Sequence, residues 1–113
     1  MLARENRITT AADFRHTLKS RRRVGTYTLV NIHPQLPVGP TRIGFILTKK
    51  NGNAVTRNLI KRRLREIGAE FLKENPTGYN AVIRALPTAK DATFADLRTE
   101  VLRSLNTMTR KSN

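Results

Sequence analysis

The sequence contains no cysteine, so it can form no disulfide, no thiolate zinc site and no cysteine nucleophile. This absence also suits a reducing cytoplasm. No apolar run approaches the ~18 residues that a membrane-spanning helix requires. The basic residues 1–10 lack the apolar stretch of a signal peptide. We therefore expect a cytoplasmic protein that does not cross a membrane.

Acidic residues are also scarce: 8 Asp and Glu oppose 22 Lys and Arg, for a net charge of +14 over 113 residues. The excess is uneven, since residues 1–65 carry fifteen of the cations and only two of the acids. A domain this basic needs a polyanionic partner. Nucleic acid is the usual one, and an anionic membrane surface is the main competitor. The length fits one domain, over residues 1–113.

Three helices are predicted from capping residues and hydrophobic spacing. The first follows Thr10, and the arginine run 21–23 lies on its end or just beyond it. The second spans residues 54–74, and the third starts near Thr93. The chain from Thr109 onward is expected to fray.

Three strands are predicted, at residues 26–33, 42–48 and 79–86. Both faces of the second strand are apolar, which places it in the centre of the sheet. The link from the second strand through the long helix to the third is long enough for a parallel crossover. The predicted fold class is therefore α/β, an α+β sandwich of three helices on a small mixed sheet, in the order α-β-β-α-β-α.

The long helix carries a row of cations, because Arg57, Lys61 and Arg65 are four residues apart and stack on one face. Asn58 and Arg62 lie on the same flank. Like charges at this spacing oppose helix formation by roughly 0.2–0.5 kcal/mol per pair, so a partner explains the row better than an ordinary solvated face does. The planar fork of arginine suits phosphate oxygens. An apolar stripe on the same helix is expected to pack on the sheet: Ile60, Leu64, Ile67 and Phe71.

Residues 43–66, which read IGFILTKKNGNAVTRNLIKRRLRE, contain a specific pattern. Paired lysines, a glycine, Ala-Val, Arg-Asn, Lys-Arg and a final arginine follow one another at fixed places. This pattern resembles the signature of the bacterial ribonuclease P protein component, and residues 6–8 and 13–14 resemble the N-terminal pattern of that family. The resemblance covers nearly the whole chain in order and length.

The resemblance implies a subunit of an endoribonuclease whose catalyst is a large RNA. The holoenzyme removes the 5′ leader from precursor tRNA with Mg²⁺ held mainly by the RNA, and the protein supplies neither catalytic residues nor a tight metal site. The partners implied are the catalytic RNA and precursor tRNA, with no membrane and no DNA. The crossover is left-handed in this family. The residues implied to bind RNA are Lys49, Lys50, Arg57, Asn58, Lys61, Arg62 and Arg65.

The resemblance also implies a cleft between the first helix and the sheet that holds the single-stranded leader, walled by Phe14, Leu18, Val30 and Ile32. Family members often carry aromatic residues where Leu18 and Ile32 stand here, so we expect less base stacking and more dependence on charge. From periodicity alone, Phe14 reads as an ordinary core residue.

Two other functions fit the composition. A ribosomal or general RNA-binding protein is also small, basic and free of cysteine. A DNA-binding domain could use the basic helix in a major groove, but the short helix and turn of a helix-turn-helix do not precede it. His16 and His33 fall in different predicted elements with no carboxylate evident beside them, so nothing in the sequence supports catalysis by the protein alone.

Overall fold

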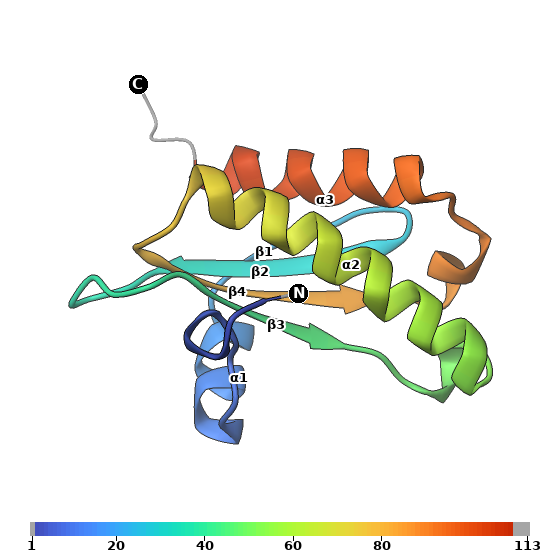
Figure 1. Cartoon of the computed structure of the whole chain (residues 1–113), viewed down its shortest axis with the longest axis horizontal. Coiled ribbons are helices and arrows are strands. Elements are labelled where there is room, and N and C mark those ends of the chain that lie inside the picture. Colours follow the sequence, from blue (N-terminus) through green and yellow to red (C-terminus); the bar gives the residue numbers. More distant parts are fainter. Residues whose placement is uncertain (1, 110–113) are drawn as a thin grey trace.

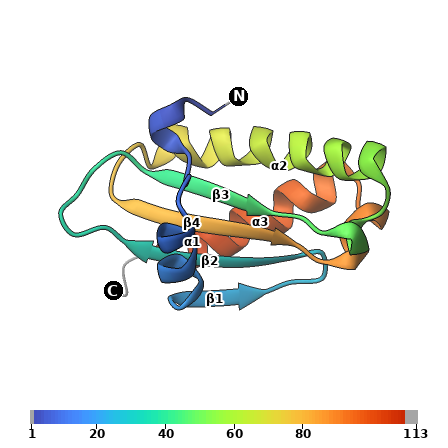
Figure 2. The same ribbon diagram turned by 90° about the horizontal axis from the view of Figure 1, so that it is seen from below.

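Four strands form one sheet in the computed structural model, which describes residues 2–109. Two helices cover one face of the sheet, and a short helix stands on the other (Figures 1 and 2). The strands are β1 (Arg21–Val24), β2 (Thr28–Pro34), β3 (Arg42–Ile46) and β4 (Tyr79–Ala85). The helices are α1 (Ala11–Leu18), α2 (Ala54–Glu74) and α3 (Phe94–Thr109), with short 3-10 segments at Arg4–Asn6, Lys49–Asn51 and Pro87–Asp91. The fraying expected beyond Thr109 concerns residues outside the described range.

The strand order is β1-β2-β4-β3. The pairs β1–β2 and β2–β4 are antiparallel, whereas β3 and β4 are parallel and are joined through α2. This mixed sheet with a helical crossover confirms the predicted fold class. The handedness of the crossover stays a prediction.

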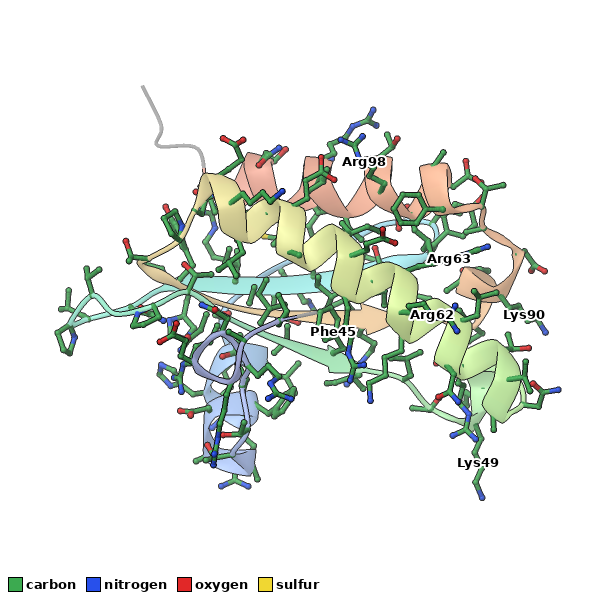
Figure 3. All side chains as sticks on the ribbon, in the orientation of Figure 1. Phe45, Lys49, Arg62, Arg63, Lys90 and Arg98 are labelled. Atoms are coloured by element: carbon green, nitrogen blue, oxygen red, sulfur yellow. The ribbon has the colours of Figure 1, made fainter. Side chains whose placement is uncertain are left out.

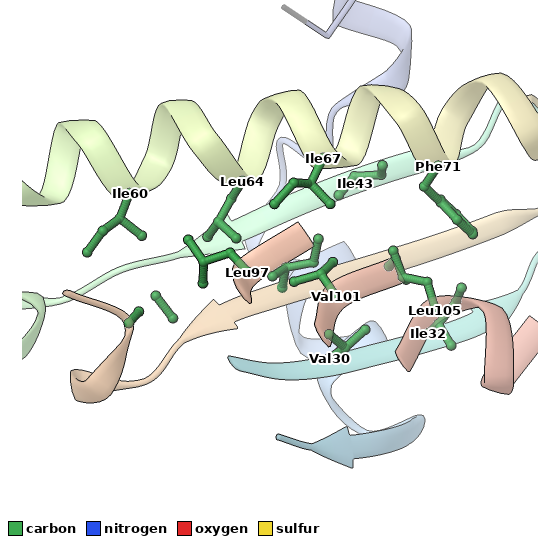
Figure 4. Packing of buried hydrophobic residues seen from close by; sticks show 14 of the residues in the cluster. Val30, Ile32, Ile43, Ile60, Leu64, Ile67, Phe71, Leu97, Val101 and Leu105 are labelled. Atoms are coloured by element: carbon green, nitrogen blue, oxygen red, sulfur yellow. The ribbon is translucent and has the colours of Figure 1, made fainter. Parts of the chain in front are cut away.

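Helix α2 begins and ends where the sequence predicts. The side chain of Asn53 caps it by accepting a hydrogen bond from the Thr56 amide at 3.0 Å, and the chain leaves the helix at Asn75, before Pro76. The four residues of its predicted apolar stripe are all buried, against the sheet and against α3 (Figure 4). Burying each such side chain stabilises the fold by about 1.5–3 kcal/mol. The opposite side of α2 is therefore fixed toward solvent.

The arginine run was expected on the end of α1 or just beyond it, and it lies just beyond it. Helix α1 ends at Leu18, and the arginines form β1, an exposed strand at the edge of the sheet next to β2. An unpaired strand edge can recruit a neighbouring segment through its backbone groups whatever side chains that segment carries. Pairing with β2 has thus overridden the local sequence of residues 21–23.

Strand β3 lies at the other edge of the sheet, so its predicted central position is wrong. Both of its faces are apolar because both are covered. Helix α2 packs on one face, and Phe14 of α1 packs on the other, at Gly44. The N-terminal segment adds a further contact, since the Ile8 amide donates to the Ile43 carbonyl at 3.2 Å.

Helix α3 begins with the reciprocal capping box expected at Thr93 and Asp96, in which each side chain accepts a 3.1 Å hydrogen bond from the other residue's amide. One turn further on, the Glu100 carboxylate holds the turn between β1 and β2. It accepts hydrogen bonds from the amides of Thr26 and Tyr27 at 2.6 and 2.9 Å, and from the Thr28 hydroxyl at 2.7 Å. This contact fixes the position of β1. Within residues 2–109, no helix combines the length and the apolarity needed to span a bilayer.

Replacing Glu100 with alanine is expected to lower the free energy of unfolding by about 2 kcal/mol, because three hydrogen bonds are lost and water competes for each of them at this half-exposed carboxylate. Urea denaturation measures this change. Thr99→Ala, at the exposed neighbouring position, is the matched control. Equal stabilities of the two variants would show that Glu100 does not hold the turn.

Candidate RNA-binding surface

The predicted cations of α2 lie together beside the edge strand β3. Arg57 and Arg65 are half-buried and Lys61 is exposed, as are the flanking residues Asn58 and Arg62. We call this surface the basic face of α2. Phe45 of β3 lies next to it (Figure 3). The Phe45 ring and the Lys61 side chain line two pockets. One, of about 300 Å³, reaches Phe14, and the other, of about 290 Å³, lies beside Arg57.

The basic face has no counter-charge of its own. Within residues 2–109 the ion pairs are Arg42–Asp13 and Arg98–Glu70, and neither involves this surface. The Nε of Arg57 is buried without a hydrogen-bond partner. The side chains of Asn58, Lys61 and Arg62 are exposed and can meet an anionic oxygen from outside the chain. The geometry therefore favours a polyanion on this face.

Arg63, in the middle of the same cationic run, has a different role. Its Nη1 donates to the Ala92 carbonyl at 3.2 Å, which ties α2 to the segment that leads into α3. The cations of α2 thus divide into a row that faces solvent and one arginine that supports the fold.

Lys49 and Lys50 are exposed on the short 3-10 turn that precedes α2. The Asn51 side chain anchors this turn by donating to the carbonyls of Ala85 and Leu86 at 3.3 and 2.8 Å. Figure 3 shows Lys49 pointing away from the molecule at this end of the sheet. A pocket of about 570 Å³ joins the two lysines to Arg84, Leu86 and Pro87.

Val30 and Ile32 cannot line a cleft beside α1. They are 0% and 2% exposed and belong to the core under α3, on the opposite face of the sheet. Side chains alternate along a strand, so an error of one residue moves the whole set to the other face. The β2 side chains on the α1 side are Leu29, Asn31 and His33.

Phe14 and Leu18, in contrast, lie on the α1 side and are half-buried. Phe14 packs so closely on Gly44 that a Cβ added there would lie 2.5 Å from its ring. Asn31 is close to Leu18, whose carbonyl accepts a 3.4 Å hydrogen bond from the Asn31 amide nitrogen. We call the surface that Phe14, Leu18 and Asn31 form between α1 and the sheet the α1 wall.

Beyond this wall the sheet is uncovered (Figure 2). Pairing register places one residue of each strand in a row across it, and alternation puts the row on the α1 side. We call this row the open face: Val24, Leu29, Arg84 and Ile46. Val24 and Arg84 are exposed, and the apolar residues Leu29 and Ile46 are half-buried.

Sequence reasoning missed the open face and Arg84 in particular. The signal for Arg84 was present, because it is the single charged residue in the otherwise apolar or neutral strand Tyr79–Ala85. Its place beside Lys49 and Lys50 depends on the fold.

Replacing Gly44 with alanine is expected to push the Phe14 ring off the sheet, since the new methyl group would overlap it. The free energy of unfolding falls by about 1–3 kcal/mol, as in other overpacked sites, and urea denaturation measures it. Gly39→Ala is the control, because its nearest neighbour in space is 3.7 Å away. If both variants kept full stability, the close approach of α1 to the sheet would be refuted.

His16 and His33 lie in contact, edge to face at 4.7 Å between ring centres, at the end of β2 opposite to Leu29 of the open face. Asp13 is nearby and pairs with Arg42 at 3.0 Å. The Thr10 side chain, and then Arg42, hold the pKa of Asp13 below its usual value. Within residues 2–109 no group of three or more His, Asp or Glu is placed to hold a metal ion.

A cationic helix row without counter-charge, beside a sheet face that combines apolar and basic side chains, defines a nucleic-acid-binding α+β domain. Comparisons with known proteins identify the family to which this domain belongs. A family model described as Ribonuclease P matches residues 2–109. The chain belongs to the family of ribonuclease P protein components and is a subunit of this tRNA-processing endoribonuclease. This confirms the resemblance drawn from residues 43–66.

Relatives match over most of their length. The ribonuclease P protein component of Pseudarthrobacter chlorophenolicus is 50% identical over 99 residues, which cover 87% of this chain and 73% of that protein. That of Clavibacter michiganensis is 44% identical over 113 residues, covering 96% and 100%. The solved RNase P protein of Staphylococcus aureus superposes with a TM-score of 0.82 at 27% identity, covering 92% of this chain and 95% of that one.

Proposed function

We propose that this subunit holds two RNAs on two adjoining surfaces. The basic face of α2, with Lys49 and Lys50, binds the catalytic RNA, and the open face with the α1 wall binds the single-stranded 5′ leader of precursor tRNA. The observation that carries the proposal is the unpaired cationic row beside an uncovered sheet face.

The two surfaces suit different forms of RNA. Successive cations on α2 rise about 6 Å per four residues along one line, which suits phosphates of a folded RNA. The open face offers apolar area to bases and Arg84 to a phosphate, the combination used to bind single strands. Phe14 is the one aromatic side chain in the α1 wall and offers a ring for stacking.

The protein itself contributes position and charge. The Mg²⁺ ions that hydrolysis requires are assigned to the RNA. Asn58 is the neutral polar side chain of the basic face, and its amide can contact a sugar, a base or the hydration shell of an ion. The cations around it reduce repulsion between the two RNAs, so we expect the protein to lower the Mg²⁺ concentration that cleavage needs.

The test is cleavage of a precursor tRNA by a bacterial ribonuclease P RNA, with and without the protein, at a few millimolar Mg²⁺. Strong stimulation with the correct 5′ end is expected. Tight RNA binding without stimulation would contradict the proposal and favour a general RNA-binding role.

A further inference from the structure

The three arginines of β1 belong neither to the basic face of α2 nor to the open face. All three are exposed, and within residues 2–109 no carboxylate lies within ion-pairing distance of them. Charged residues on an edge strand often prevent pairing with another molecule. That explanation treats Arg21, Arg22 and Arg23 alike.

The register of β1 separates them. Arg22 lies opposite Asn31, which faces α1, whereas Arg21 and Arg23 lie opposite Ile32 and Val30, which face α3. Paired residues share a face of the sheet. Arg22 is therefore on the same side as the open face, two residues from Val24.

Val24 of the open face and Arg22 are successive residues on the same side of β1. The row of the open face crosses all four strands, a width of about 14 Å at ordinary strand spacing. Lys49, Lys50 and Arg84 lie toward the β3 side, and Arg22 lies at the β1 edge. Leu29 of β2 lies between them and is half-buried, and Val24, next to Arg22 on β1, is 61% exposed. Cations at both ends and apolar side chains along the row suit a single strand that crosses the sheet.

We infer that Arg22 binds the distal part of the leader, the nucleotides furthest from the cleavage bond. This inference rests on the leader path proposed above. The leader runs from β3 toward β1 across the open face, a base packs on Val24, and the Arg22 guanidinium contacts a phosphate. Longer leaders thereby gain a contact that short leaders cannot reach.

The experiment measures affinity of the holoenzyme for precursor tRNAs whose leaders are lengthened one nucleotide at a time, under conditions in which cleavage is slow. The variants are Arg22→Gln, Arg21→Gln and Arg23→Gln, which remove the same charge from adjacent positions. Only Arg22→Gln is expected to lose the gain in affinity that the outermost leader nucleotides give, about threefold to fivefold. For precursor tRNAs with long leaders, this variant should also lower the slope of log affinity against log salt concentration by about 0.7.

Equal effects of the three variants would overturn the inference, since general electrostatics or protection of the strand edge would then explain the run. Self-association of Arg22→Gln in sedimentation would do so too. An equal loss of affinity for the catalytic RNA alone would assign Arg22 to that RNA instead. If the unaltered protein gave no preference for any leader over leaderless tRNA, the leader path itself would fail, and the inference with it.

Discussion

Replacing Arg57 and Arg65 together with alanine is expected to lower the affinity for the catalytic RNA about 150-fold. Both guanidinium groups lie on the basic face of α2, and within residues 2–109 neither forms an ion pair. Two charge-assisted hydrogen bonds are worth roughly 3 kcal/mol in sum. Each lost phosphate contact also removes about 0.9 from the slope of log affinity against log salt. Filter binding over a range of salt concentrations measures both quantities.

Arg63→Ala is the matched control, on the same helix and with the same change of charge per residue. Because Arg63 donates to the Ala92 carbonyl, its loss should lower stability and leave the salt slope nearly unchanged. Arg57→Gln and Arg65→Gln preserve more of the half-buried side chain and should still flatten the slope. A slope that changed only for Arg63 would show that the basic face of α2 does not meet the RNA.

Helix α2 could be predicted closely from the sequence because its determinants are local. Asn53 caps it, Pro76 follows its end, and the apolar stripe keeps a helical period between them. The basic face on the same helix follows from the same period. Strand β1 has no such signal: the pattern of residues 21–23 carries no strand period, and the free edge of β2 decides their conformation.

The open face could not be predicted because it depends on the register of four strands at once. The sequence indicates that β2 is a strand, but not which of its two side-chain sets faces α1. Choosing Val30 and Ile32 instead of Leu29 and Asn31 placed the predicted cleft residues in the core. The contact of Glu100 with the β1–β2 turn joins residues more than seventy positions apart, and no local pattern reports it.

Replacing Phe14 with alanine is expected to reduce the preference for leader-bearing over leaderless tRNA about tenfold. A base stacked on an aromatic ring contributes roughly 1–3 kcal/mol, and the proposed leader path passes this ring. Affinity for the catalytic RNA should change little, because the basic face of α2 is intact. Competition between the two tRNAs for the holoenzyme measures the preference directly.

Ile32→Ala is the informative comparison, since Ile32 lies on the same strand as the wall but on its other face. It should cost about 2–5 kcal/mol of stability through the cavity left in the core. In protein that remains folded, the preference for the leader should stay unchanged. Leu29→Ala changes a side chain of the same strand that lies on the open face. It should lower the preference for the leader and leave stability less affected. A loss of leader preference for Ile32→Ala equal to that for Phe14→Ala, at temperatures well below unfolding, would place the leader elsewhere, because no RNA can reach a side chain buried beneath α3.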